Sequence, residues 1–208
     1  MNGYHIITPL TRFSNIPELL SLLGKNKVHW HFIIDDVLPY EVSAKPEFDW
    51  VHFYRFPHRE KAEGIDPCLV RLNWWLELGL LIDDDRYIFL NDDDGFEPFF
   101  FEKIRAQEGH VLVCSMARGH RTPLGVEPHR AHGTHSLIAA KENMVPCRVS
   151  LEQIIISGKV LKTFRFSELY GGDGEFIKAI TEANDTVYMP DTFTWFNYLE
   201  PNRWDKYT

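Results

Sequence analysis

Short apolar runs alternate with amphipathic stretches along the first half of the chain. Runs rich in β-branched and aromatic residues, typical of buried strands, occupy residues 4–7, 28–34, 50–56, 87–90 and 111–115. Between them, apolar residues recur at helical spacing after Pro17, Pro67 and Pro98. Proline favours the first turn of a helix, and Asp66 before Pro67 is a good N-cap. The first of these helices should end near Gly24 and the third near Gly109.

This alternation predicts an α/β fold with a mostly parallel central sheet and helices on both faces. The second half is more mixed. Residues 153–157 and 160–166 look extended, a helix is predicted from about residue 175 to 182, and a late strand is predicted at 186–189. Residues 117–136 are rich in Gly, Pro, His and Arg, which predicts a long functional loop. Without an internal repeat or a linker, we expect one domain over residues 1–208.

An acidic triplet, Asp92-Asp93-Asp94, follows directly after the apolar strand at residues 87–90. Adjacent carboxylates repel one another and resist burial, so they contribute little to folding. Ligands of open α/β sheets bind outside the carboxyl ends of the strands. Hard divalent cations prefer carboxylate oxygens and complete their coordination with phosphate and water. The position of the triplet therefore predicts a site for Mn²⁺ or Mg²⁺ and a phosphate-bearing ligand.

A second triplet, Asp83-Asp84-Asp85, offers a comparison within the same chain because it precedes that strand. It lies at the opposite end of the strand from the predicted cleft, so we expect a solvated turn there. The alternative interpretation of Asp92–Asp94 is a similar solvated turn, and only their position separates the two triplets.

Composition narrows the class of protein. The 208 residues are 44% hydrophobic and 25% charged, and the formal net charge is −8. This charge disfavours a general nucleic-acid or membrane-surface binder, although a bound metal would still attract an anionic substrate. No apolar run reaches the length of a membrane span, and the N-terminus lacks a signal-peptide pattern. The odd, widely spaced Cys68, Cys114 and Cys147 favour a reduced, cytoplasmic protein without disulfides or a cysteine zinc site.

Taken in order, these segments resemble a GT-A-fold glycosyltransferase. The first strand leads into Thr8-Pro9-Leu10-Thr11-Arg12, the second ends in acidic residues, and the triplet follows the central strand. About 80 residues later, Gly172-Asp173-Gly174-Glu175 opens a helix. The order covers nearly the whole chain and is most similar to inverting family-2-like enzymes, with some likeness to glucuronyltransferases.

The resemblance implies a metal-dependent enzyme that transfers a sugar from a UDP-sugar to the hydroxyl of a sugar or glycan acceptor. Residues 1–116 would form the nucleotide-sugar half, and residues 117–208 the acceptor half. Asp94 and Asp92 would bind the metal, and Asp92 or Asp93 would hold the ribose. Asp173 would be the general base that takes the proton of the acceptor hydroxyl, with Glu175 as the second candidate. A plain helix cap is the alternative for Asp173.

The motifs depart from the family pattern at two points. The family usually pairs Glu with Asp in the later motif, whereas Gly172 stands at the position of the first acid. No histidine follows His135, so the C-terminal histidine metal ligand of some GT-A enzymes is missing.

Further candidates lie at the strand ends, on one helix and in the long loop. Candidates for nucleotide binding are Thr8, Pro9, Leu10, Arg12, Asp35, Asp36, Arg71 and Asn73. Candidates for the acceptor side or a lid are Arg118, Arg121, His132 and Trp195. Surface solvation, a helix salt bridge or core packing are the alternatives for these residues. The spacing of His129, His132 and His135 also suggests a zinc site, but Pro128 and Gly133 argue against one regular helix face.

Two other functions stay open. A sugar-nucleotide nucleotidyltransferase would share the fold, but the loop after the first strand lacks the glycine-rich, basic signature of those enzymes. A non-catalytic metal-binding or carbohydrate-binding module would keep the acidic triplet without needing a base. The sequence does not define the sugar or the acceptor, and it leaves open whether the chain forms a homo-oligomer.

Overall fold

The computed structural model describes residues 3–23, 25–36, 49–59, 62–122, 125–128, 137–146, 148–196 and 199, without the side chains of 118–122 and 125–128. The strands are β1 (Tyr4–Leu10), β2 (His29–Asp35), β3 (Val51–Phe56), β4 (Arg86–Phe89), β5 (Gly95–Phe96), β6 (Val111–Thr122), β7 (Gly125–Pro128), β8 (Ile154–Ser157) and β9 (Thr186–Phe196). The helices are α1 (Ile16–Leu22), α2 (Pro67–Glu77), α3 (Phe100–Arg105), α4 (Gly158–Leu161) and α5 (Gly172–Ala183), with 3-10 turns η1 (Phe13–Asn15), η3 (Lys141–Asn143) and η4 (Leu151–Gln153).

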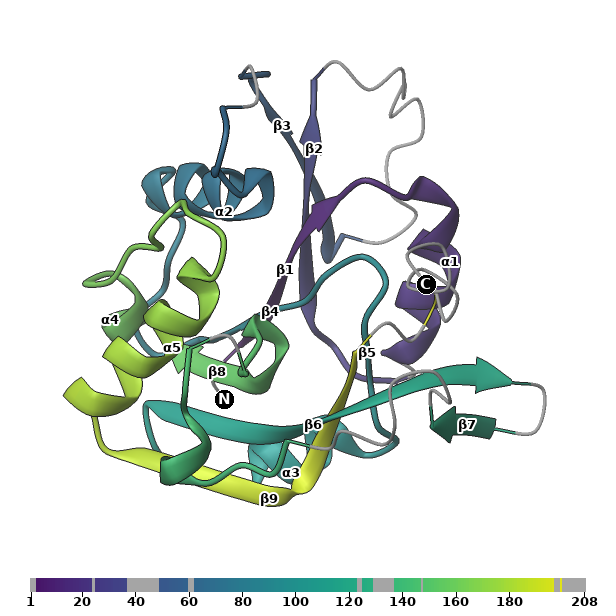
Figure 1. Cartoon of the computed structure of the whole chain (residues 1–208). Helices are drawn as coiled ribbons and strands as arrows, with labels where there is room; N and C mark the ends of the chain where they lie inside the picture. The colour runs from purple at the N-terminus through teal and green to yellow at the C-terminus, as the bar shows by residue number, and fades with distance from the viewer. Residues whose placement is uncertain are drawn as a thin grey trace.

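Within the described residues, the strands form one curled sheet in the order β3-β2-β1-β4-β8-β6-β9-β5, with β7 paired to β6 (Figure 1). The pairs β3-β2, β2-β1, β1-β4 and β6-β9 are parallel, whereas β7 is antiparallel to β6 and β5 is antiparallel to β9. Strand β8 is antiparallel to both β4 and β6. The predicted α/β fold is confirmed. The purely parallel part of the sheet is formed by β1 to β4 of the N-terminal half.

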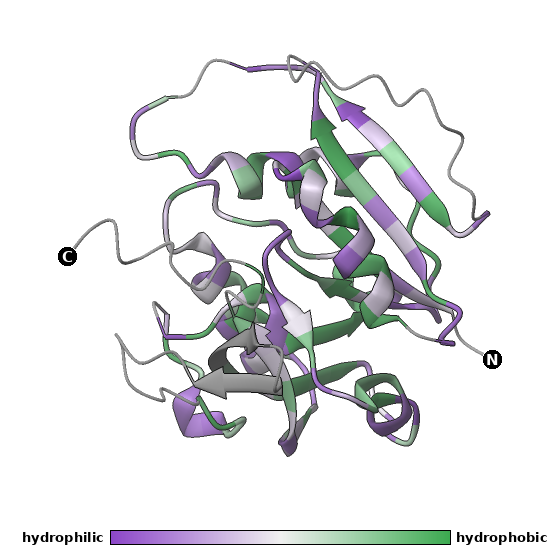
Figure 2. Cartoon of the chain, turned by 90° about the vertical axis from the view of Figure 1, so that its right-hand side faces the viewer, coloured by the Kyte–Doolittle hydropathy of each residue, from purple (hydrophilic) through white to green (hydrophobic). Residues whose placement is uncertain are grey.

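Two hydrophobic cores lie on opposite faces of this sheet. Successive strand residues point to opposite faces, so Ile7 and Phe89 pack with α2 and α5, whereas Ile6 and Ile88 pack with α1 and α3. Figure 2 shows largely hydrophobic central strands beside helices of mixed character. The start of α2 is as predicted, because the Asp66 side chain accepts a hydrogen bond from the backbone N–H of Cys68 at 2.8 Å. Helices therefore cover both faces, as expected.

Two predictions for the second half are wrong. Residues 160–166 are not a strand, since α4 and a turn fold the apolar residues of this segment back onto the core beside β8. Residues 117–122 and 125–128 are not loop but the ends of a hairpin between β6 and β7, with Gly119 opposite Pro128. Pairing between strands supplies hydrogen bonds that a polar, glycine-containing sequence does not reveal. His129, Arg130, His132 and His135 lie outside the described residues.

Strand β9 is longer than predicted and passes through Pro190. The register of β6 against β9 shifts between Cys114 and Ser115, so that Met189 and Phe193 face consecutive residues of β6. A proline fits at such an irregularity because it need not donate to the ladder. The extension carries β9 on to Phe196, which borders the cavity described below.

Among the described residues, no helix combines the length and the apolarity that a membrane span requires.

Candidate functional site

A cavity of about 520 Å³ lies where the parallel strands β1 and β4 end. It brings together predicted residues from the loop after β1, the triplet, α2 and the start of α5: Pro9, Arg12, Arg71, Asp92, Asp93 and Asp173. Its other lining residues, which the sequence did not single out for this site, are Thr11, Asp66, Pro67, Cys68, Leu69, Asn91, Met116, Arg148, Val149, Ser150, Leu151 and Phe196. Strand-end position pointed to Pro9, Arg12, Asp92 and Asp93, whereas Arg71 and Asp173 lie on helices and came from the family resemblance. The other lining residues come mainly from connections without a motif.

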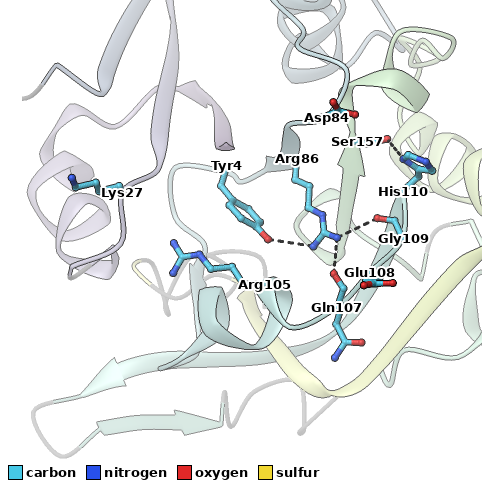
Figure 3. A pocket seen from close by; sticks show the side chains of 10 residues that line it. All are labelled: Tyr4, Lys27, Asp84, Arg86, Arg105, Gln107, Glu108, Gly109, His110 and Ser157. Atoms are coloured by element: carbon cyan, nitrogen blue, oxygen red, sulfur yellow. Dashed lines mark hydrogen bonds between the residues drawn. The ribbon is translucent and has the colours of Figure 1, made fainter. Parts of the chain in front are cut away.

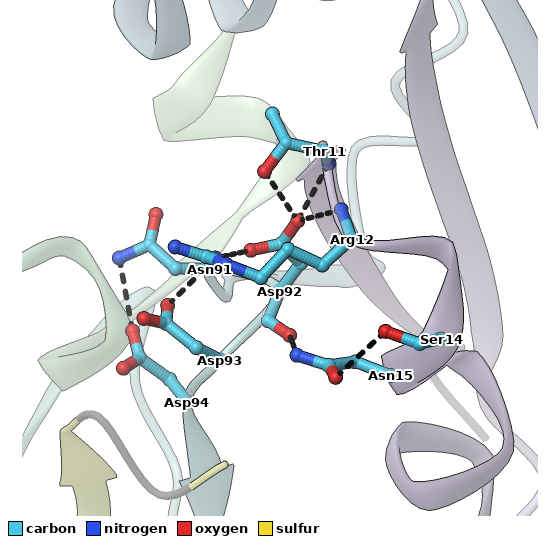
Figure 4. A network of polar contacts seen from close by, with 8 residues as sticks. All are labelled: Thr11, Arg12, Ser14, Asn15, Asn91, Asp92, Asp93 and Asp94. Carbon is cyan, nitrogen blue, oxygen red and sulfur yellow. Dashed lines mark hydrogen bonds and ion pairs between the residues drawn. The ribbon is translucent and has the colours of Figure 1, made fainter. Parts of the chain in front are cut away.

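Asp92 ties the loop after β1 to the loop after β4 (Figure 4). Its Oδ2 accepts hydrogen bonds from the Thr11 backbone N–H at 2.5 Å, the Thr11 hydroxyl at 2.8 Å and the Arg12 backbone N–H at 2.7 Å. Its Oδ1 accepts from the Arg12 guanidinium, and its backbone carbonyl accepts from Asn15. Both carboxylate oxygens are therefore engaged by the protein itself.

Asp93 and Asp94 are buried beside this clamp, with exposures of 2% and 0%. Arg12 lies 3.6 Å from Asp93, and Asn91 donates to Asp94 at 2.9 Å. The described residues contain no group of three or more His, Cys, Asp or Glu side chains arranged around one metal position. Mg²⁺-type ions, however, often take only one or two protein carboxylates and complete their shell with phosphate and water. Carboxylate oxygens such as those of Asp94, which lies buried next to the cavity-lining Asp93, are the donor type that such an ion takes, whereas those of Asp92 are already used.

The second triplet, Asp83-Asp84-Asp85, is the predicted solvated turn at Asp83 and Asp84, but the Asp85 side chain is only 15% exposed. Asp83 and Asp84 form a turn, and Asp83 is an exposed carboxylate 2.5 Å from the Lys162 ammonium, which lowers the pKa of Asp83. Asp85 accepts hydrogen bonds from the backbone N–H of Gly3 and from His5. Position relative to the strand, rather than the acidic run itself, therefore distinguishes the two triplets.

Arg71 contributes a buried guanidinium to the cavity wall. Its Nη2 lies 3.5 Å from Asp35 Oδ2, and Asp35 is also within 3.1 Å of His58. The Nε and Nη1 atoms of Arg71 are buried and have no hydrogen-bond partner among the described residues. Unpartnered buried donors are costly. An anionic ligand in this cavity would supply the hydrogen-bond acceptors that these two nitrogens lack.

Asp173 lies in the first turn of α5, where two glycines shape the backbone. Gly171, the N-cap, has a φ of 86°, a conformation that favours glycine. A Cβ at Gly172 would stand 2.0 Å from the backbone oxygen of Ser167, so no acid can occupy the position where the family usually has one. Burial raises the pKa of Asp173; the backbone N–H of Gly174 opposes this, and the Asp66 carboxylate adds to it. The N-cap is Gly171, so Asp173 is not the cap of this helix.

Seven of the residues predicted for nucleotide, metal or base roles lie outside the cavity lining, and one of them is Asp94, which is fully buried next to Asp93. The other six are Thr8, Leu10, Asp35, Asp36, Asn73 and Glu175. The Thr8 hydroxyl accepts from the Trp30 indole at 2.9 Å, and Leu10 is in the core. Asp36 accepts from the backbone N–H of His58, whereas Asn73 pairs with the backbone of residue 166. Glu175 is exposed on α5. Asp35 reaches the cavity only through its contact with Arg71.

The acceptor-side candidates are spread out. Trp195 lines a separate cavity of about 200 Å³ with Phe96 and Phe99, on the other side of the β5–β9 pair from Phe196. Arg118 and Arg121 belong to β6, and their side chains are outside the described residues, as is all of His132.

A missed residue, Glu152 of η4, lies buried beneath the cavity. Burial raises the pKa of Glu152 to about 7; the Ser150 hydroxyl opposes this shift, and the carboxylates of Asp173 and Asp93 add to it. No motif marks this residue, because its position depends on contacts between distant parts of the chain.

A larger cavity of about 780 Å³ lies at the opposite end of the strands (Figure 3). Its most buried charge is Arg86, which donates to the Tyr4 hydroxyl and to the backbone carbonyls of residues 104, 107 and 109. These bonds hold the end of α3 and the start of β6 against β4. Arg86 is therefore a structural clamp, and the smaller cavity is the candidate functional site.

Comparison with solved structures identifies the class of fold. S. aureus TarS (residues 1–349) is similar over 93% of this chain and 60% of its own, with a TM-score of 0.60 and 14% identity. A 4-diphosphocytidyl-2C-methyl-D-erythritol synthase is similar over 92% of this chain and 90% of its own, with a TM-score of 0.50 and 8% identity. No protein-family model and no curated protein sequence matches the chain.

These likenesses show a GT-A-like α/β fold, as the sequence resemblance implied. The chain spans about three fifths of the TarS chain. At such low identity, the activity has to be argued from the site itself.

Proposed function

We propose that this chain is a metal-dependent glycosyltransferase that moves a sugar from a UDP-sugar to the hydroxyl of a sugar or glycan acceptor, with inversion. One observation carries the proposal: the loop after β1, Asp92 and Asp93 of the acidic triplet, and Asp173 meet in one cavity at the carboxyl end of a GT-A-like sheet. The sequence order that resembles family-2-like enzymes supports the same assignment.

The donor diphosphate is assigned to the side of the cavity with Arg71. Two nitrogens of this guanidinium lack partners among the described residues, and guanidinium groups bind phosphate oxygens through charge-assisted hydrogen bonds. Pro9 and Arg12 border the same space and would contact the nucleoside.

Asp94 is the proposed ligand of Mn²⁺ or Mg²⁺. When bound, the ion would neutralise the charge that develops on the leaving nucleoside diphosphate. We assign Asp92 a separate role, the anchoring of the nucleotide loop, because Thr11 and Arg12 already saturate its carboxylate.

Asp173 is the proposed general base. An inverting transfer needs one carboxylate that takes the proton of the acceptor hydroxyl as its oxygen attacks the anomeric carbon. Asp173 borders the cavity, and burial raises its pKa, which makes it a better proton acceptor than a solvated carboxylate.

Nucleotidyl transfer is the second candidate. This candidate is retained because the chain is structurally similar to a synthase whose name records a diphosphocytidyl product. Against it, residues 8–12 contain no glycine and only one cation, Arg12, where nucleotidyltransferases of this fold carry a glycine-rich, basic loop.

The first experiment is a thermal-shift and calorimetric screen of nucleoside diphosphates, triphosphates and sugar nucleotides with Mn²⁺, Mg²⁺ or EDTA. Metal-dependent stabilisation by UDP and by one UDP-sugar is the expected result. Preferential binding of a nucleoside triphosphate would favour nucleotidyl transfer. Absence of nucleotide binding would contradict both enzyme assignments.

Asp173→Asn then separates an enzyme from a binding module. The variant should bind the UDP-sugar normally but lose turnover. Glu175→Gln, an exposed carboxylate on the same helix, is the matched control and should retain both. A product with retained anomeric configuration would remove Asp173 as an inverting base.

A further inference from the structure

A fully buried carboxyl group links the floor of the cavity to its lining. Glu152 has no exposed surface, and η4 packs against β4, β6, β9 and α5. Its Oε2 accepts a 2.6 Å hydrogen bond from the Ser150 hydroxyl, and Oε1 is buried without a partner among the described residues. Ser150 also borders the cavity. One hydroxyl therefore connects the buried carboxyl to the space for the ligand.

The groups that face Glu152 do not neutralise a negative charge. Asp173 at the start of α5 and Asp93 after β4 act on it as like charges. Cys114 of β6 donates its thiol to the Glu152 backbone carbonyl, and burial raises the pKa of this thiol, so it adds no positive charge. An ionised Glu152 would be a third carboxylate in the interior, with one oxygen that nothing solvates.

We propose that Glu152 is a positioning residue of the candidate active site: it keeps its proton in mildly acidic solution, releases it as pH rises through neutrality, and holds the Ser150 hydroxyl from beneath. In its protonated state it leaves Asp93 and Asp173 as the only carboxylates of this trio that carry charge. The part of the proposal that concerns Asp173 as a base rests on the proposed function. The part that concerns the proton on Glu152 does not.

The consequence for the site is electrostatic. A neutral Glu152 lets Asp173 ionise and then accept a proton. Loss of the Glu152 proton adds repulsion beneath the cavity, which disfavours a bound diphosphate. Wild-type affinity for UDP should therefore weaken severalfold between pH 6.5 and 8.5, and the Glu152→Gln variant, which is neutral and has nearly the same shape, should lose this pH dependence.

Protein stability tests the proton without any substrate. The folded-state pKa of Glu152, about 7, lies above its ordinary value of 4.5. The stabilisation from the buried proton is then fully present below pH 4.5, declines as pH rises, and is lost above about pH 7. Relative to Glu152→Gln, the folding equilibrium constant of the wild type should fall by up to about tenfold per pH unit within this window. Titration of other groups cancels in the comparison.

Ser150→Ala is the second variant. The Ser150 hydroxyl lowers the pKa of Glu152, so its removal should move the end of the stability decline to higher pH. Parallel stability curves for the wild type and Glu152→Gln from pH 5 to 8 would overturn the proposal.

If Glu152→Gln does not fold, infrared difference spectroscopy of the wild type between pH 5 and 8 gives the answer. The carbonyl band of a protonated carboxylic acid should disappear with a midpoint near pH 7, and its absence at pH 6 would overturn the proposal. Failure of the wild type to bind any nucleotide would instead remove the transferase assignment and leave the stability difference in place.

Discussion

Arg12 and Asp92 are separated by 80 residues in the sequence and joined by two hydrogen bonds in the structure. The Arg12 backbone N–H donates to Asp92 Oδ2 at 2.7 Å, and its guanidinium donates to Oδ1. Thr11 adds two further donors to the same carboxylate. Charge-assisted bonds of this kind are among the stronger hydrogen bonds in proteins. The two loops that border the cavity are thus held as one unit by the first carboxylate of the triplet.

Replacement of Asp92 by asparagine should destabilise the protein. Asparagine keeps the shape but removes the charge, so Arg12 loses its charge-assisted hydrogen bonds to Asp92 and keeps the 3.6 Å contact with Asp93, at a cost of about 2 kcal/mol. Urea unfolding measures the effect. Asp83→Asn, in the exposed turn before β4, is the control and should leave the midpoint unchanged. Equal midpoints for wild type and Asp92→Asn would show that the clamp does not stabilise the fold.

Replacement of Asp94 by alanine should weaken metal-dependent nucleotide binding, whereas the replacement of Asp92 is expected to act on stability. We expect metal-dependent UDP affinity to fall by at least about tenfold, equivalent to about 1.4 kcal/mol, because the proposed ligand of the ion is removed. Calorimetry in Mn²⁺ and in EDTA measures the change. Affinity that stays the same in Mn²⁺ would exclude Asp94 as the metal ligand.

Replacement of Arg71 by methionine should weaken nucleotide binding without destabilising the fold. An apolar residue of similar length removes the cost of two unpartnered buried nitrogens but also removes the 3.5 Å contact with Asp35, which keeps His58 at 3.1 Å. Because these two effects oppose each other, the thermal midpoint should change little, while the Kd for UDP increases by at least about tenfold, or about 1.4 kcal/mol. A lower midpoint with normal UDP affinity would mean that Arg71 serves the fold and not the ligand.

Acid should destabilise the protein through a row of histidines on β1, β2 and β3. A continuous hydrogen-bonded chain runs from Tyr54 to His31 at 3.0 Å, from His31 to His5 at 2.9 Å, and from His5 to Asp85 at 2.9 Å. Neutral rings satisfy this chain when the Tyr54 hydroxyl donates to His31, His31 donates to His5, and His5 donates to Asp85. An added proton on His31 would disturb this order.

Burial is the largest cause that lowers the pKa of His5, His31 and His52, and for His31 the value falls to about 2. The neighbouring rings of His29 and His52 add to the decrease, Asp85 opposes it at His5, and Trp75 and Tyr87 cover the row with uncharged rings.

A lowered folded-state pKa means that these histidines stabilise the fold fully above about pH 6.5 and that this contribution is lost as pH falls below it. Each buried ring should cost up to about 1.4 kcal/mol per pH unit in this range. Chemical denaturation at pH 7.0 and 5.5 measures the loss. His31→Gln keeps a donor and an acceptor and should reduce the pH dependence. A wild-type stability that is constant between these pH values would contradict the assignment.

The sequence by itself determined the order of the elements and the place of the acidic triplet. Hydrophobic periodicity is local, so β1, β2, β3, β4 and the start of α2 at Asp66-Pro67 could be read directly. The rule that ligands bind at the carboxyl ends of parallel strands then separated Asp92–Asp94 from the solvated Asp83. Short segments such as residues 160–166 remained ambiguous, because a few residues do not distinguish helical from strand periodicity and tertiary packing decides between them.

Only the tertiary structure decided what each carboxylate does. Asp92 and Asp94 look alike in the sequence, yet one is saturated by Thr11 and Arg12, which lie far away along the chain. The requirement for glycine at position 172 is explained by the Ser167 backbone oxygen, which would lie 2.0 Å from any Cβ placed there. Glu152 became visible as a neighbour of Asp173 only once η4 and α5 were packed together. Contacts of this kind join residues whose separation in sequence carries no periodic signal, so folding alone reveals them.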